Sequence, residues 1–132
     1  MDRQPIIGYI QHWLDTVCKH NARDIVNLYA SDGVLLGTVA ENIKDGQTEI
    51  MEYFDMFVTK KPCGVIDTYY VQDYGDIAIV DGTYTFELND DYGSRDSVPA
   101  RYTFVLRKVN GGWKIATHPV SYTHLRAHET KA

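Results

Sequence analysis

The stretch VPARYTFVLRKVNGGWKIATH, from Val98 to His118, carries the strongest fold signal in this chain. Two β-rich runs of alternating side chains flank Asn110-Gly111-Gly112, a sequence typical of a tight hairpin turn. Neither face of the first run is cleanly polar: Arg101, Thr103 and Val105 share one face, and Tyr102, Phe104 and Leu106 share the other. A sheet that is apolar on both faces needs two covers, for example helices on one side and another subunit on the other.

One polar residue of this hairpin stands out. Arg101 is a cation in the middle of a strand that we expect to be covered, so it is either a paired structural charge or the anion-binding group of a pocket. In the second run, Trp113, Ile115 and Thr117 alternate with Lys114, Ala116 and His118. Strict alternation would place Ile115 and His118 on opposite faces.

The composition is that of one soluble globular domain. The chain has 132 residues, of which 44% are hydrophobic and 23% are charged. Its net charge of -5 argues against nucleic acid or an anionic membrane surface as the main partner. Ten tyrosines against four phenylalanines indicate amphipathic surfaces, such as a wet pocket or a subunit interface, more than a dry core.

The sequence predicts a cytoplasmic protein. No apolar run approaches the roughly 20 residues of a membrane helix, and the N-terminal residues MDRQPIIGYIQHW lack the apolar region of a signal peptide. Cys18 and Cys63 are too few for a disulfide framework. We therefore expect both cysteines to be reduced and structural.

Helical patterns dominate the first part of the chain. Apolar residues at helical spacing predict a helix from about Arg3 to about Lys19, with Asp2 as its N-cap. Asn21 is expected to cap a short second helix, which Ser31-Asp32-Gly33 would terminate.

The pattern changes from helices to strands in the middle of the chain. The apolar run 34–36 predicts a short buried strand, and Asp45 is expected to cap a third helix that ends at Lys60-Lys61-Pro62. From Cys63 onward the side chains alternate, which predicts strands over Cys63–Asp73 and Asp76–Leu88 before the hairpin.

Helices followed by four long strands are typical of an α+β fold. Gly82, inside the second long strand, indicates a bulge or bend in a strongly curved sheet. Folded over its own helices, such a sheet makes a cone whose open mouth is a natural ligand pocket. We therefore expect a cone-shaped, curved antiparallel sheet packed on N-terminal helices over residues 1–119.

The end of the chain is excluded from this prediction. The segment VSYTHLRAHET (120–130) resembles one reading frame of a transposase sequencing adapter. Residues 120–132 are therefore expected to be a non-native or disordered tail, and the alternative is a native end that frays. His124 and His128 carry no functional prediction for this reason.

Four segments of the chain resemble one protein family. DIVNLYASDGVLLGT (24–38), YFDMFVTKKP (53–62), GTYTFEL (82–88) and ARYTFVLRKVNGGWKI (100–115) are similar to the association, or hub, domain of calcium/calmodulin-dependent protein kinase II and its stand-alone relatives. That family belongs to the nuclear transport factor 2-like superfamily, which also holds ketosteroid isomerases, limonene epoxide hydrolases and SnoaL-like polyketide cyclases. No kinase motif of the GxGxxG, HRD or DFG type is present.

The resemblance implies a cystatin-like α+β barrel that forms homodimers and, in some members, higher-order rings. It also implies a deep polar pocket, lined by arginine, for a small carboxylate. Stand-alone relatives end in a His-rich, HHSS-like segment, whereas this chain has ATHP at 116–119, so His118 is the one residue left of that segment.

Seven residues are candidate ligand contacts. The Arg101 guanidinium can bind a carboxylate through two parallel hydrogen bonds. The alternative is an internal ion pair with Asp81 or Glu87. His118 could act as a base or a second donor, but a partnerless histidine at a fraying chain end is the favoured interpretation. Five aromatic residues could line the mouth of the cone: Trp13, Tyr29, Tyr53, Phe57 and Tyr84. The alternative is that they are core residues, as aromatic stripes more often are.

Several chemistries are excluded by spacing. Asp81 and Glu87 lie on one strand face roughly 20 Å apart, too far to act on one substrate bond. The loop 89–93 resembles a calcium ligand set but lacks the EF-hand spacing. No zinc spacing, phosphate-binding loop or nucleophilic triad can be assembled, so we expect no metal and no cofactor.

Two functional hypotheses remain. The first is a non-catalytic association module that dimerises through the outer sheet face, formed either by Tyr102, Phe104 and Leu106 or by the residues of opposite parity. The second is a small-molecule binding protein, hydrolase or isomerase that uses the cone, with Arg101 orienting an acidic ligand.

Overall fold

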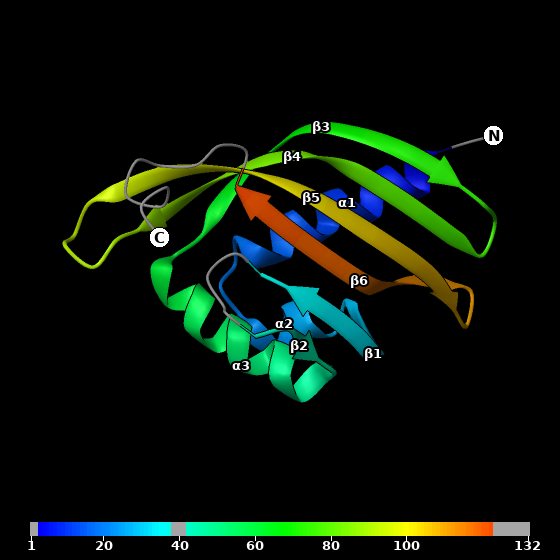
Figure 1. The fold of residues 1–132 in the computed structure, drawn as a ribbon, viewed down its shortest axis with the longest axis horizontal. Coiled ribbons are helices and arrows are strands. Elements are labelled where there is room, and N and C mark those ends of the chain that lie inside the picture. Colours follow the sequence, from blue (N-terminus) through cyan, green and yellow to red (C-terminus); the bar gives the residue numbers. More distant parts are fainter. Residues whose placement is uncertain (1–2, 38–41, 123–132) are drawn as a thin grey trace.

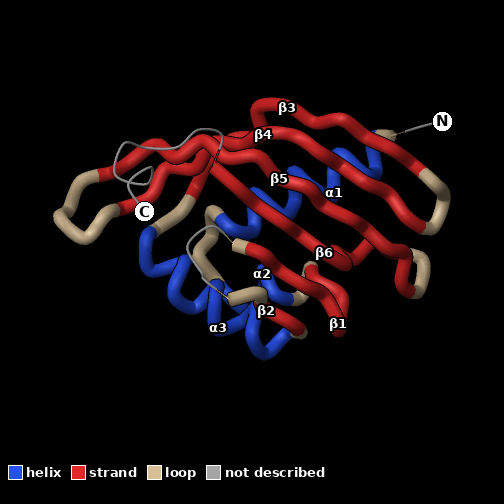
Figure 2. Tube along the Cα trace, viewed as in Figure 1, coloured by secondary structure: helices blue, strands red, loops and turns tan. Residues whose placement is uncertain are grey.

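One curved, six-stranded sheet with its helices on a single side forms the fold (Figure 1, Figure 2). The structure is a computed structural model that describes residues 3–37 and 42–122. Its elements follow in this order: α1 (Gln4–Val17), α2 (Ala22–Val26), β1 (Tyr29–Leu36), β2 (Lys44–Asp45), α3 (Gln47–Phe57), the 3-10 turn η1 (Val58–Lys60), β3 (Cys63–Asp73), β4 (Ile77–Asn89), β5 (Arg95–Val109) and β6 (Gly112–Tyr122).

The predicted α+β class is confirmed. The strands lie in the order β2-β1-β6-β5-β4-β3, so the four long strands are consecutive antiparallel neighbours. Only the pairing of β1 with β6 departs from the predicted antiparallel sheet, because these two strands run parallel. The sheet is curved but stays unclosed, with β2 at one edge and β3 at the other.

Helix α1 supplies the centre of the core. Pro5 lies in its first turn, where a missing backbone N–H costs nothing. Its apolar stripe packs on the inner sheet face, and Trp13 is only 2% exposed. Arg3 is the N-cap and gives no side-chain hydrogen bond, while Asp2, the predicted cap, lies outside the described residues. In the described part of the chain, no helix is long and apolar enough to cross a membrane.

The short elements differ in detail from the prediction. Asn21 caps α2 as expected, because its side chain accepts a hydrogen bond from the backbone N–H of Asp24 at 3.2 Å. Residues 31–33 do not terminate a helix: they lie within β1, where the register shifts between Tyr29 and Val34. Gly46, with φ 87°, replaces Asp45 as the N-cap of α3, since only glycine adopts that backbone conformation without strain.

The hairpin turn matches its sequence. Asn110 and Gly111 have φ of 53° and 82°, the positive values that a two-residue hairpin turn of this kind requires. Gly82 also fits its prediction, because β3 has an irregular register opposite this part of β4 and a Cβ on Gly82 would collide with the carbonyl of Thr68. The close approach of β3 to β4 at this irregularity therefore requires glycine at position 82.

Strand β6 extends beyond the predicted domain boundary. Val120 and Ser121 pair with Tyr102 and Arg101 of β5, so residues 120–122 belong to the sheet and not to a tail. The remaining part of the predicted tail, residues 123–132, lies outside the described residues.

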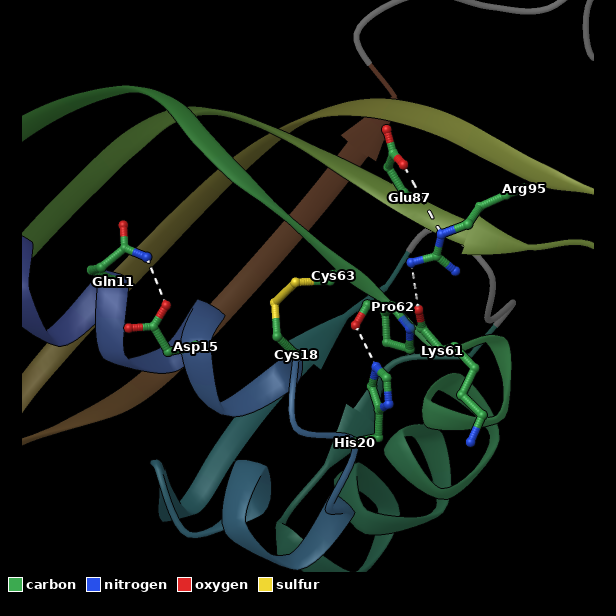
Figure 3. Close-up of a disulfide and its surroundings, with 9 residues drawn as sticks. All are labelled: Gln11, Asp15, Cys18, His20, Lys61, Pro62, Cys63, Glu87 and Arg95. Atoms are coloured by element: carbon green, nitrogen blue, oxygen red, sulfur yellow. Dashed lines mark hydrogen bonds and ion pairs between the residues drawn. A yellow bond between two sulfur atoms is a disulfide. The ribbon is translucent and has the colours of Figure 1, made fainter.

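The prediction that both cysteines are reduced is wrong. Cys18, which caps the C-terminal end of α1, forms a disulfide with Cys63, the first residue of β3 (Figure 3). Counting cysteines could not reveal this, because 45 residues separate the two and only the packing of α1 against β3 brings them together. The disulfide joins the end of α1 to an edge strand of the sheet.

We predict that replacing both cysteines, Cys18→Ser with Cys63→Ser, lowers the free energy of unfolding by about 3–4 kcal/mol. A crosslink over this sequence separation restricts the unfolded chain by that order of magnitude. Urea unfolding at neutral pH measures the change, and wild-type protein unfolded in the presence of reductant should lose a similar amount. An unchanged midpoint in both samples would contradict the prediction.

Candidate functional site

A β-bulge in β6 brings His118 into the interior. Val105 pairs with Thr117 but Leu106 pairs with Ile115, which leaves Ala116 as an extra residue without a partner on β5. Because one extra residue reverses the side-chain alternation, Ile115 and His118 both point to the inner face. Their exposures are 0% and 1%.

Aromatic rings surround the imidazole of His118. Phe104 stacks on it, with ring centroids 4.0 Å apart and an interplanar angle of 17°. Trp13 meets it edge to face at 5.2 Å. His118 is therefore a buried polar residue in an aromatic core, and the predicted histidine at a fraying end is wrong.

Both imidazole nitrogens have hydroxyl partners. Tyr29 Oη lies 2.9 Å from Nδ1, and Tyr84 Oη lies 3.2 Å from Nε2. The indole N–H of Trp13 donates to Tyr29 Oη at 3.2 Å, which extends the chain of hydrogen bonds to α1. We call these four residues, Trp13, Tyr29, Tyr84 and His118, the buried polar chain.

The buried polar chain has one more polar hydrogen than it has hydrogen bonds between its members. A neutral imidazole carries one N–H, so the four residues supply four hydrogens to the three hydrogen bonds between them. If His118 carries its hydrogen on Nε2, the hydroxyl hydrogen of Tyr84 is left over; if it is on Nδ1, that of Tyr29 is left over. In either tautomer one buried hydroxyl can donate to a further acceptor.

Burial keeps every side chain of the buried polar chain neutral. Loss of solvent lowers the pKa of His118 from 6.5 to about 3, because the cation would lie among aromatic rings. Burial likewise raises the pKa of Tyr29 and that of Tyr84 well above 10.0. With a pKa near 3, His118 is a weak base at neutral pH.

Arg101 does not belong to this site. It is exposed and lies on the outer face of β5, opposite in parity to the buried Tyr102 and Phe104. Among the described residues it makes neither the predicted interior contact nor an ion pair with Asp81 or Glu87. The prediction that Arg101 lines the interior is therefore wrong, for the simple reason that its parity places it on the other side of the sheet.

The predicted aromatic residues fall into two groups. Trp13, Tyr29 and Tyr84 belong to the buried polar chain. Phe57 is packed in the core at 9% exposure, and Tyr53 is partly buried, with its ring stacked on Phe57 and placed where a Cβ on Gly37 would be. Four of the five are therefore buried among the described residues, and Tyr53 is partly exposed.

The acidic candidates lie outside the core. Asp81 is exposed and accepts a hydrogen bond from Thr103, and the exposed Glu87 approaches Arg95 at 4.0 Å. In the loop after β4, the side chain of Asp90 accepts hydrogen bonds from the backbone N–H groups of Tyr92 and Ser94. Within residues 3–37 and 42–122, no three metal-binding side chains gather.

Sequence reasoning named every member of the buried polar chain but did not connect them. The link depends on the bulge at Ala116, and neither glycine nor proline marks that position. The one signal in the sequence was His118 itself, the residue left of the His-rich segment that the resemblance implies.

We predict that His118 makes the protein less stable in mild acid. Its folded-state pKa lies below its unfolded-state value, so the unfolded chain binds the proton first as the pH falls below about 6.5. Stability is complete above that pH and declines toward about pH 3, by about 2 kcal/mol between pH 7.5 and pH 5.

Urea unfolding over this pH range measures the effect. His118→Gln should remove this share of the pH dependence while the share from other groups stays. Equal pH dependence in both proteins would contradict a buried, neutral His118.

Comparison with known proteins places this geometry in a family. The family model for the calcium/calmodulin dependent protein kinase II association domain matches residues 2–123. A crystal structure described as such a domain, from Xanthomonas campestris, has a TM-score of 0.88 and 38% identity, and the match covers 93% of this chain and 89% of that one. No curated protein matches the chain significantly.

More distant structures share the fold. A nuclear transport factor 2-like superfamily protein from Salmonella enterica has a TM-score of 0.81 at 18% identity, covering 95% of this chain and 93% of that chain. A ketosteroid isomerase-like protein from Erwinia carotovora has a TM-score of 0.79 at 20% identity, covering 95% and 100%. From the family model and the Xanthomonas structure, this chain belongs to the calcium/calmodulin dependent protein kinase II association domain family.

Proposed function

We propose that this protein is an association module that forms a homodimer through the outer face of its sheet. The observation that carries the proposal is the one-sided cover of the sheet: the helices lie on the inner face, and no other described element covers the outer face of β3 to β6 (Figure 1). Membership in an association-domain family supports the same conclusion.

The chemistry of the outer face suits a protein partner. Its centre is mostly uncharged, and we call the following residues the outer-face patch: Tyr70, Ile77, Ile79, Thr103, Val105 and Thr117. Tyr70 is 69% exposed and Ile77 is 37% exposed, so this face presents apolar surface that a partner could bury. Because Tyr102, Phe104 and Leu106 are core residues, the outer face has the opposite parity, the second of the two predicted alternatives.

Charge supports a second copy as the partner. Arg101 and Asp81 are both exposed on this face, and Arg101 makes no ion pair with a described residue of its own chain. In a dimer with a twofold axis, a contact between two different residues across the interface occurs twice, once in each direction. Arg101 of one subunit can therefore pair with an acidic residue such as Asp81 of the other.

We predict that the wild-type protein is a dimer at micromolar concentration and that Ile79→Glu with Val105→Glu makes it a monomer. The two introduced carboxylates of each subunit would be buried without a partner, next to the same negative charges of the other subunit. Size-exclusion chromatography with light scattering gives the mass, including that of any ring.

Met56→Glu is the matched control for this experiment. Met56 is 74% exposed on α3, on the other side of the molecule, so its replacement should leave the mass unchanged. A monomeric wild-type protein would remove the association proposal.

A second candidate function is binding of a small molecule at the buried polar chain. The leftover hydroxyl hydrogen supports it, since a buried donor favours an acceptor atom. The contacts of His118 in the described part of the chain are aromatic and neutral, so an uncompensated anion would be costly there. We therefore propose a neutral ligand with a carbonyl oxygen in place of the predicted acidic one.

The isomerase or hydrolase alternative has weaker support. His118 is a weak base, and Asp81 and Glu87 lie on the far side of the sheet from it. A ligand also reaches the buried polar chain only if core side chains move, because Tyr29 and Tyr84 are 0% and 3% exposed.

We predict that benzamide binds more tightly than benzoate, and that Tyr84→Phe weakens this binding while Arg101→Ala does not. Quenching of tryptophan fluorescence reports on the site, since Trp13 stacks on Tyr84 at 5.7 Å. Tighter binding of benzoate, or its loss in Arg101→Ala, would favour the acidic ligand. Binding of neither compound would contradict this candidate.

The predicted cytoplasmic location remains a prediction. The disulfide argues in the opposite direction, because disulfides persist mainly in oxidising compartments.

A further inference from the structure

A groove opens beside the disulfide at the edge of the sheet. It has a volume of about 280 Å³ and is lined by Cys63, Gly64, Val65, Thr85, Glu87 and Arg95. Both cysteines are only partly buried. The groove therefore gives a small molecule access to the Cys63 end of the disulfide.

Arg95 is held at this groove by hydrogen bonds. Its Nη1 donates to the side chain of Asn89 at 2.8 Å. Its Nη2 donates to the carbonyl of Lys61 at 2.9 Å (Figure 3). Its Nε lies 4.0 Å from Glu87, so the carboxylate only partly offsets the charge. The guanidinium thus stays beside the strand that begins with Cys63.

The two sulfurs have different electrostatic surroundings. Cys63 shares its groove with the Arg95 cation, which favours a thiolate, and with its cross-strand partner Glu87, whose carboxylate opposes that effect. Cys18 caps the C-terminal end of α1, where the partial negative charge of the helix disfavours a thiolate. In the reduced protein, Cys63 is therefore the more reactive thiol on two independent grounds, access and charge.

We propose that Cys63 is the site of thiol–disulfide exchange with a small anionic thiol, and that Cys18 is the resolving thiol. The Cys63 thiolate attacks a small disulfide, forms a mixed disulfide and releases one small thiolate. The Cys18 thiolate then attacks Cys63 Sγ, forms the Cys18–Cys63 bond and expels the second small thiolate. In the reducing direction, the small thiolate attacks Cys63 Sγ and the electron pair of the broken bond leaves on Cys18, which takes a proton from water.

The groove lies along the same strands as the outer-face patch and shares no residue with it. Thr85 of the groove follows Asp81, the cross-strand partner of Tyr70 and Thr103, by four residues, which is roughly 13 Å of strand. The mass of each sample, measured by light scattering, shows whether the exchange and the proposed dimer change together.

Two single-cysteine variants form the matched test. Cys18→Ser leaves Cys63 as a free thiol, and Cys63→Ser leaves Cys18. With 5,5'-dithiobis(2-nitrobenzoic acid), an anionic disulfide, Cys63 should react about tenfold faster than Cys18 in folded protein, as checked by circular dichroism. Equal rates or the reverse order would overturn the proposal.

The wild-type protein provides a test that does not depend on how the variants fold. Reduced protein is mixed with oxidised glutathione, quenched in acid after short times and digested for mass spectrometry. The glutathione adduct should appear on the peptide containing Cys63 and then decay as the internal disulfide forms. An adduct found first on Cys18 would overturn the proposal.

Arg95→Gln tests the role of the cation. If its loss raises the pKa of the Cys63 thiol by about one unit, the thiolate fraction falls about tenfold. The thiolate of the less acidic thiol is the stronger nucleophile, which raises the reaction rate again by about threefold. The rate with the anionic reagent should therefore fall about threefold in the Cys18→Ser background, and Arg95→Lys should restore most of it. An unchanged rate in Arg95→Gln would show that access alone controls the reaction and would overturn the electrostatic part.

Discussion

The packing of Trp13 against the inner face of the sheet is the contact on which this fold depends. Its ring lies 5.7 Å from that of Tyr84 on β4 and 5.0 Å from that of Phe104 on β5. It also lies 5.2 Å from the ring of His118 on β6, and its N–H donates to Tyr29 on β1. One side chain of α1 thus contacts four strands. A flat sheet could not bring all four to one indole, so burial of this ring and the curvature of the sheet require each other.

The inner face of the sheet is largely aromatic. Among the described residues, these side chains bury His118 of the final strand. The polar groups in this core are tolerated because each has a partner. No described element covers the outer face of β3 to β6, and this is the face through which we propose that the protein associates.

The disulfide adds a covalent constraint at the edge that packing alone holds least well. Strand β3 has a sheet neighbour on one side only, and its first residue is tied to the end of α1. Near the same point His20 Nε2 lies 2.8 Å from the carbonyl of Pro62, and Arg95 binds the carbonyl of Lys61 (Figure 3). One disulfide and two hydrogen bonds therefore join the start of β3, with the two residues before it, to the rest of the molecule.

The sequence by itself determined the fold class, the long strands and the family, because these depend on local periodicity and turn chemistry. The helical stripe around Trp13 and the Asn110-Gly111 turn needed no tertiary information. It could not place Arg101 outside and His118 inside, since one extra residue at Ala116 reverses the alternation and nothing local marks it. Only the tertiary structure decided which face is the core and that Cys18 meets Cys63, because both result from contacts between segments far apart in the chain.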